Sequence, residues 1–156
     1  MRAPISVIMA VCNAERVLPR QLAALGEALA EGLVRELILV DGGSTDATLR
    51  IAAEAGAEVL VGSRNRAKAL AQGAAAALGE WLLFPAAASL PAPGWTGEVL
   101  RHLERRAGQA GTLAARPMAT GWPRFWPRLW PGRPWVLVPQ GLYHAAPEAA
   151  LRRVGR

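Results

Sequence analysis

The segment DGGS at residues 41–44 combines residue types that can bind a polar ligand. Asp41 carries a carboxylate that accepts hydrogen bonds, and Ser44 carries a hydroxyl group that both donates and accepts them. The two glycines between them allow a ligand to approach the backbone closely. A structural interpretation is also open, because the segment can form a turn with Ser44 or Thr45 as the N-cap of a following helix. Asp46 would then lie beside the positive N-terminal end of that helix.

A second chemical feature is the lack of acidic residues after the fourth apolar run of the chain. The segment WLLFPAAASLPAPGW, residues 81–95, passes from an apolar stretch into a loop, and no acid occurs between Glu80 and Glu98. Ligands of α/β enzymes bind beside loops of this kind, and the working carboxylates are expected there. His102 and His144 are far apart in the sequence and lack the spacing of metal ligands. The usual acidic chemistry is therefore missing from this part of the sequence.

Strands and helices alternate through the first part of the chain, which predicts an α/β fold. Apolar runs predict strands at residues 5–12, 36–41, 57–62 and 80–84, and the first two have the pattern of buried strands. Apolar spacing, capping residues and alanine content predict helices over residues 17–33, 46–56 and 66–78. Alternation with short loops predicts a Rossmann-like, mostly parallel sheet with right-handed crossovers and helices on both faces.

The loops after these four strands should meet at one edge of the sheet. They comprise residues 12–13, 41–44, 62–66 and 85–89. Ligands of open parallel sheets bind beyond the carboxyl ends of the strands, so we expect the four loops to form one crevice. Arg66 opens the next helix and can reach a phosphate group there, although it suits a surface position equally well.

The pattern weakens after Trp95, where the chain becomes rich in tryptophan and proline. Residues 97–108 predict an amphipathic helix, residues 136–143 a last strand and residues 147–154 a short terminal helix. In segment 122–135 a Trp-Pro pair recurs at four-residue spacing, and the prolines exclude a continuous helix. We therefore expect this segment to be extended or rich in turns.

Charge is distributed unevenly along the 156-residue chain, whose net charge is +6. Residues 1–100 carry eight basic and ten acidic side chains, whereas residues 101–156 carry ten arginines and two glutamates. A basic C-terminal third suggests an anionic partner such as a phosphate group, a nucleic acid or a lipid surface. It also suits a solvated basic surface.

The single cysteine, Cys12, excludes an internal disulfide and favours a reducing compartment. It follows a predicted strand without a nearby histidine, so we interpret it as a packed small residue and not as a nucleophile. No window approaches the ~20 apolar residues of a membrane helix, and the first residues lack a signal-peptide cleavage site. The expected location is the cytoplasm, with peripheral contact at the inner face of the membrane as an option.

Four motifs occur in an order that points to one protein family. The chain has neither a GxGxxG nor a Walker P-loop pattern, so ordinary dinucleotide and P-loop chemistry are disfavoured. It does contain, in order, ISVIMAVCNAE, ELILVDGGSTDAT, RAKALAQGAAAALGEWLLF and LPAPGW. Together these motifs resemble the family 2 glycosyltransferases, which have the nucleotide-diphospho-sugar transferase (GT-A) fold. The resemblance covers Ile5 to Trp95, and PQGLYHAAPEAA at 139–150 is similar to a later segment of a bacterial subgroup.

The resemblance implies a site for a nucleoside diphosphate sugar at the ends of the first two strands. In the family these segments hold the nucleobase and the ribose. Carried over by position, with Arg66 added as a phosphate contact, the implied nucleotide-binding residues are Ala10, Cys12, Asn13, Glu15, Asp41, Gly43, Ser44 and Arg66. The family usually has proline at position 10 and an aromatic residue at position 12, so this chain departs from the pattern at both.

The resemblance also implies a divalent-metal site, which this sequence has lost. In the family, acids at the end of the fourth strand bind a metal that neutralises the diphosphate leaving group. By position these are Ala86, Ala87 and Ala88, whose methyl groups cannot coordinate Mg²⁺ or Mn²⁺, and the hydroxyl of Ser89 alone is insufficient. We therefore expect no metal cofactor. The family's general base has no match, and the remaining candidates, which suit solvated helix positions, are Glu98, Glu104 and Glu148.

Three functions stay open from the residues. The first is a glycosyltransferase that works without metal. Its diphosphate leaving group would be neutralised by Arg64, Arg66 and Lys68 or by the C-terminal arginines. The second is a non-catalytic relative, a pseudoenzyme, that keeps the crevice or only the scaffold. The third is an interaction module that uses segment 122–135.

Segment 122–135 has several interpretations of its own. Its rings can cover the open side of the sheet, form a homodimer contact, or lie at a membrane surface through Trp122, Trp126 and Trp130. Stacking on single-stranded nucleic acid is the least expected role. We expect residues 1–95 to form the nucleotide-binding half of one domain and residues 96–156 to complete that domain.

Overall fold

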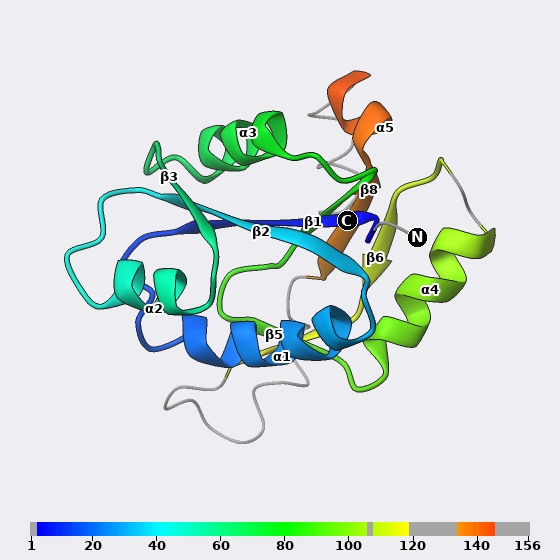
Figure 1. Ribbon diagram of the computed structural model, residues 1–156, viewed down its shortest axis with the longest axis horizontal. Coiled ribbons are helices and arrows are strands. Elements are labelled where there is room, and N and C mark those ends of the chain that lie inside the picture. Colours follow the sequence, from blue (N-terminus) through cyan, green and yellow to red (C-terminus); the bar gives the residue numbers. More distant parts are fainter. Residues whose placement is uncertain (1–2, 106–107, 119–133, 146–156) are drawn as a thin grey trace.

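The computed structural model describes residues 3–105, 108–118 and 134–145. Strands and helices alternate through the first part of the chain, as predicted (Figure 1). The strands are β1 Ile5–Val11, β2 Val34–Asp41, β3 Glu58–Val61, β4 Trp81–Phe84, β5 Ser89–Pro91, β6 Gly111–Leu113, β7 Ala115–Pro117 and β8 Trp135–Pro139. The helices are α1 Leu18–Ala30, α2 Thr48–Glu54, α3 Arg66–Ala76, α4 Trp95–Arg105 and α5 Gln140–Ala145.

Six of the strands form a central sheet in the order β3-β2-β1-β4-β8-β6. β1 runs parallel to β2 and β4, and β2 runs parallel to β3. In this register Val11, Asp41 and Val61 lie side by side, so three strands end at one level. β8 is antiparallel to β4 and β6. The predicted mostly parallel α/β sheet is confirmed, with an antiparallel extension at one side.

Helices cover both faces of the sheet, because its central strands alternate two sets of apolar side chains. In β1, Val7 and Met9 belong to a core with α1, α2 and α4, whereas Ile8 belongs to a second core with α3 and α5. Figure 1 shows α3 and α5 on one side of the sheet and α1, α2 and α4 on the other. Strands buried on both faces read as continuous apolar runs, which is the pattern that predicted them.

Small residues let α3 pack closely on the sheet. Its buried positions are Ala69, Leu70, Gly73 and Ala74. A Cβ atom added at Gly73 would lie 2.5 Å from Cγ2 of Ile8, so no larger side chain fits without a shift of the helix. The small residues of α3 therefore allow a short distance between this helix and the sheet.

The structure corrects the prediction for residues 136–143. The strand ends at Pro139, and Gln140–Ala145 forms helix α5 in place of a continued strand. The side chain of Gln140 donates to the carbonyl of Ala77, and its backbone N–H donates to the carbonyl of Glu80. The apolar residues Leu142 and Tyr143 had suggested a longer strand, but Tyr143 packs against Phe84 from the helix.

The pairing of β5 with β7 was not predicted. Ser89 lies opposite Pro117 and Pro91 opposite Ala115 in a separate two-stranded sheet. These strands have only three residues each, so no hydrophobic alternation marks them in the sequence. Their pairing holds the segment that follows β4 beside the core that contains α1, α2 and α4.

Parts of the predicted C-terminal structure lie outside the described residues. The expected helix at 147–154 falls there, as do Trp122, Trp126 and Trp130 and the contacts proposed for them. Of segment 122–135 only Pro134 and Trp135 are described, and Trp135 is a fully buried residue of β8. Among the helices of the described ranges, none is both long enough and apolar enough to cross a membrane.

Candidate functional site

Hydrogen bonds join the loops that follow β1, β2, β3 and β4. The backbone N–H of Asn13 donates to Oγ of Ser44 at 2.9 Å, which ties the first loop to the second. Nε of Arg64 donates to the carbonyl of Gly42 at 3.1 Å, which ties the third loop to the second. Nη2 of Arg66 donates to the carbonyl of Pro85 at 3.1 Å, which ties the start of α3 to the loop after β4. The predicted convergence of these loops is confirmed.

Asp41 organises the turn at the end of β2. Asp41 is 4% exposed, and its Oδ2 accepts hydrogen bonds from the backbone N–H groups of Gly43 and Ser44, both at 3.0 Å. Oδ1 accepts a further hydrogen bond from the hydroxyl of Ser44. Asp41 therefore fixes the conformation of residues 42–44, where Gly43 has a φ of 97° that favours glycine. Direct contact between Asp41 and a ligand stays a prediction.

Asn13 and Glu15 connect the first loop to the start of α2. Oδ1 of Asn13 accepts from the backbone N–H of Thr45 at 2.8 Å, and Oε2 of Glu15 accepts from that of Ala47 at 3.1 Å. Asn13 has a φ of 49°, in the left-handed region that asparagine tolerates better than most residues. Both predicted site residues thus lie at the junction of these loops, and each stabilises that junction.

Ser44 and Thr45 do not cap helix α2, which corrects the structural alternative proposed for them. The helix begins at Thr48, and Oδ1 of Asp46 accepts from the backbone N–H of Thr48 at 2.9 Å. Ser44 is drawn away from this role by its bonds to Asp41 and Asn13. Asp46 lies at the positive end of the helix, as predicted.

Asp46 has a lowered pKa. Desolvation raises the pKa of its carboxyl group, but this is outweighed by hydrogen bonds from the side chain and backbone of Thr48 and from the backbone N–H of Glu15. All of these bonds favour the charged form, because the carboxylate accepts each of them. A charged Asp46 therefore holds the first two loops together.

The other predicted nucleotide-binding residues lie in or beside the same region. Cys12 is exposed, with Sγ 4.0 Å from the carbonyl oxygen of Gly42, so it lies at the surface beside the second loop instead of packing in the core as predicted. Ala10 is in β1 and packs partly against the core beside α3. Arg66 is half-buried at the start of α3. The structure brings all eight predicted positions to one end of the sheet.

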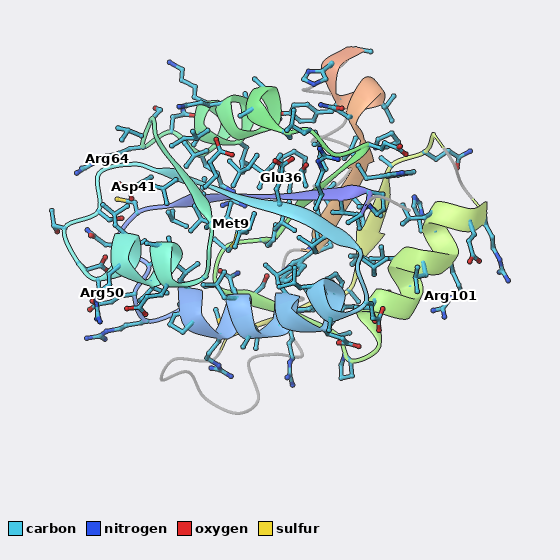
Figure 2. The ribbon with its side chains drawn as sticks, viewed as in Figure 1. Met9, Glu36, Asp41, Arg50, Arg64 and Arg101 are labelled. Carbon is cyan, nitrogen blue, oxygen red and sulfur yellow. The ribbon has the colours of Figure 1, made fainter. Side chains whose placement is uncertain are left out.

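Arg64 is a residue of this site that the predicted set omitted, although it was considered as a source of positive charge. It lies across the turn of the second loop, since a Cβ atom added at Gly42 would be 3.2 Å from its Cα atom. Figure 2 shows Arg64 and Asp41 close together at the carboxyl ends of the strands, with Arg101 at the far side of the molecule. Its position directly after the third strand was the available signal in the sequence.

The described general-base candidates do not lie beside the loops that follow β1 and β2. Glu98 and Glu104 are exposed residues of α4, which Figure 1 shows at the opposite end of the sheet from the loops after β1 and β2. Glu148 lies outside the described residues. His102 faces the ring of Trp81 and bonds the carbonyl of Gln109, so it has a structural position.

Comparison with known proteins identifies the class of this chain. The family model for glycosyl transferase family 2 matches residues 6–155, and the chain belongs to this family. The predicted GT-A type of fold is therefore confirmed. No curated protein matches the chain.

Two solved structures of glucosyl-3-phosphoglycerate synthase from Mycobacterium tuberculosis illustrate the similarity. One, in complex with Mn²⁺, UDP and glucosyl-3-phosphoglycerate, is 27% identical, with a TM-score of 0.58 over 69% of this chain and 42% of that chain. The other, in complex with Mn²⁺ and UDP-glucose, is 29% identical, with a TM-score of 0.55 over the same shares of the two chains. This chain thus spans less than half the length of the synthase.

The residues at positions 86–88 do not fit the divalent cation that accompanies UDP in those synthase structures. Ala86 is buried, and Ala87 and Ala88 are exposed, but none has an oxygen in its side chain. Among the described residues, no group of three or more His, Cys, Asp or Glu side chains is placed to hold a metal ion. Mg²⁺ and Mn²⁺ are bound in proteins mainly through oxygen ligands, which the side chains of Ala86, Ala87 and Ala88 do not offer.

Proposed function

We propose that this protein binds a nucleoside diphosphate sugar in the crevice between the loops after β1, β2 and β3. The observation that carries this proposal is the hydrogen-bonded convergence of these loops, with Asp41, Ser44 and Asn13 at their junction. Support also comes from the family and from the UDP and UDP-glucose named for the similar synthase structures.

The residues of the crevice suit the separate parts of such a ligand. Asn13 and Ser44 carry groups that can meet the hydroxyl and N–H groups of a nucleoside, and the backbone at Gly43 is open to close approach. Arg64 and Arg66 place two positive charges beside the junction, where a diphosphate group would be stabilised by charge-assisted hydrogen bonds. We assign the first 95 residues to this binding half and the remainder to the completion of the same domain.

Transfer of the sugar to an acceptor is the activity that belongs with this binding site. The bond between the sugar and the diphosphate would break as an acceptor oxygen attacks the sugar carbon. Binding without transfer is the second candidate, and the distance of Glu98 and Glu104 from the crevice favours it. Release of UDP from UDP-glucose, measured with and without an acceptor mixture, distinguishes the two.

The exposed thiol of Cys12 provides a direct test of binding. It is the only cysteine in the chain and lies at the crevice, so the rate of its modification reports on this site alone. We expect saturating UDP or UDP-glucose to slow its reaction with a thiol reagent several-fold. The Asp41→Ala variant should lose this protection, because residues 42–44 depend on that carboxylate.

A matched control uses the far side of the molecule. The Arg101→Gln variant should keep the full protection of Cys12, since Arg101 lies away from the crevice (Figure 2). If UDP, UDP-glucose and other nucleoside diphosphates all leave the modification rate unchanged, with and without Mn²⁺, the proposal is wrong.

A further inference from the structure

The loop after β4 is held by hydrogen bonds from side chains of distant elements. Gln21 of α1 is 3% exposed, and its Nε2 donates to the carbonyl oxygens of Ala86 at 2.9 Å and Ser89 at 3.1 Å. The hydroxyl of Ser89 also donates to the carbonyl of Ala86, at 2.8 Å. Nε1 of Trp135 donates in turn to that hydroxyl at 2.8 Å. Helix α1 and strand β8 thus fix the loop from two sides.

The hydrogen bonds of this loop engage the carbonyl oxygens of Pro85, Ala86 and Ala88, which are oxygen atoms that a cation at this loop could otherwise use. The carbonyl of Ala86 accepts two hydrogen bonds, which is the capacity of its two lone pairs. The carbonyl of Ala88 accepts from the backbone N–H of Met118 at 2.8 Å. A divalent ion that used the carbonyl of Ala86 would have to displace the buried hydrogen bonds of Gln21 and Ser89, and among the described residues no buried side-chain nitrogen or oxygen lacks a partner. Such displacement leaves buried donors unpaired, which is costly.

A positive side chain already lies at this loop. Nη2 of Arg66 donates to the carbonyl of Pro85 at 3.1 Å, so its guanidinium group is placed between α3 and the end of β4. Arg64 is bonded to the neighbouring loop through Gly42. Arginine keeps its charge at any ordinary pH and binds phosphate oxygens with good geometry.

We propose that this crevice binds a nucleoside diphosphate without a divalent cation. Gln21, Ser89 and Trp135 hold the loop in the place of a metal ion, and Arg66, with Arg64, supplies the positive charge. This inference rests on the proposed function, because it concerns the same ligand in the same crevice. It adds how the diphosphate is neutralised and which residues do so.

The first experiment measures the affinity for UDP by calorimetry in excess EDTA and again in excess Mn²⁺ or Mg²⁺. We expect the two dissociation constants to agree within about twofold, a difference well under the 1.4 kcal/mol that a factor of ten represents. Affinity that rises about tenfold or more with the cation overturns the inference and leaves the proposed function standing. Failure of UDP and of other nucleoside diphosphates to bind under both conditions overturns the proposed function, and the inference with it.

The second experiment tests the role of Arg66 with uridine as the comparison ligand. Arg66→Gln should weaken UDP binding by about tenfold or more, which is the effect of losing a charge-assisted hydrogen bond. Its affinity for uridine, which has no diphosphate group, should not change, and added Mn²⁺ should not restore UDP binding. Arg66→Lys should retain part of the UDP affinity, and Arg101→Gln should retain all of it. Equal losses for UDP and uridine, or no loss for either, would show that Arg66 does not supply the charge.

The third experiment requires no nucleotide. Titration of the protein with Mn²⁺, followed by electron paramagnetic resonance, should leave the signal of the free ion unchanged. Loss of that signal on addition of the protein, reversed by Mg²⁺, would reveal a divalent-cation site and contradict the inference.

Discussion

Ala88 has a backbone conformation that alanine rarely adopts. Its φ is 48°, in the left-handed region, and its carbonyl is held by Met118. For a residue with a Cβ atom this region costs about 1–2 kcal/mol, whereas glycine adopts it freely. The strain lies in the loop that the buried network of Gln21 and Ser89 holds in place.

We predict that Ala88→Gly raises the free energy of unfolding by roughly 0.5–1 kcal/mol, measured by urea denaturation. The gain is smaller than the strain itself because glycine also loses more conformational freedom on folding. Ala87→Gly is the matched control, since Ala87 is exposed in the same loop and does not have a positive φ. The control should lower stability by roughly 0.5–1 kcal/mol, and equal effects of both substitutions would contradict the assigned strain.

The carboxylate of Asp46 makes the junction of the first two loops dependent on pH. Its folded-state pKa is lowered below the ordinary value of 3.8 by hydrogen bonds from Thr48 and Glu15 that outweigh desolvation. A lowered pKa contributes stability that is present in full above the unfolded-state value and is lost as the pH falls through the folded-state value. The junction should therefore weaken only in acid.

We predict that the stability difference between the natural protein and Asp46→Asn is largest near neutral pH and shrinks as the pH falls below 3.8. Thermal unfolding of both proteins across this range provides the measurement. Glu54→Gln is the control, because Glu54 pairs with Arg50 across 3.7 Å with side chains 67% and 73% exposed, and such pairs contribute little. A difference for Asp46→Asn that grows in acid would contradict the assigned direction.

At the scale of the helix, the spacing between α3 and the sheet depends on the absence of one side chain. Gly73 faces Ile8 in the second core, whereas Gly26 in the middle of α1 has open space around it, with no heavy atom within 4 Å of an added Cβ. The two glycines have the same helical backbone but opposite surroundings. Substitutions at these two positions therefore distinguish the effect of packing on stability from the effect of helix propensity.

We predict that Gly26→Ala stabilises the protein by about 1 kcal/mol, which is the difference in helix propensity between the two residues. Gly73→Ala should instead destabilise it by about 1–3 kcal/mol, because overpacking exceeds the same gain. Urea denaturation of both variants measures the pair. A stabilising Gly73→Ala would mean that α3 can move away from Ile8 without cost.

The parallel half of the fold could be predicted from the sequence because its central strands are buried on both faces. Continuous apolar runs marked β1, β2 and β4, and the topology then placed their carboxyl ends together. The three-residue strands β5 and β7 carry no periodic signal, and no sequence pattern marks the antiparallel direction of β8. Helix α5 was missed because Leu142 and Tyr143 fit a strand pattern equally well.

The candidate site, like the fold, could be predicted only in part. The predicted residues lie at one end of the sheet because parallel topology requires it. The bonds that shape the crevice join residues far apart in the sequence, such as Asn13 to Thr45 and Gln21 to Ala86. A single sequence does not reveal such pairs, since many polar side chains have similar local surroundings. The bonded position of Arg64 across Gly42 was hidden for this reason.

At the scale of the whole molecule, β8 joins the C-terminal part to both cores. Trp135 and Leu137 pack in the core with α1 and α4, and Val136 and Val138 pack in the core with α3. The strand also pairs with all four residues of β4. The two parts of the chain therefore share one hydrophobic interior.

We predict that a fragment of residues 1–95 does not fold cooperatively by itself. Removal of β8 would expose one edge of β4 together with the apolar surface on both faces of the sheet. Near-ultraviolet circular dichroism and thermal unfolding of this fragment and of the full chain provide the measurement. A sharp unfolding transition in the fragment would show that residues 1–95 form an independent domain.

The buried amide of Gln21 has a consequence for kinetics. Hydrogen bonds from α1 and β8 hold the loop after β4 in place once the chain has folded. Ligand binding therefore does not require this loop to become ordered first. Preorganised binding surfaces lose little conformational entropy on association. The rate at which the proposed nucleoside diphosphate binds should then depend on diffusion and on the ionic strength of the solution, with no slow rearrangement before binding.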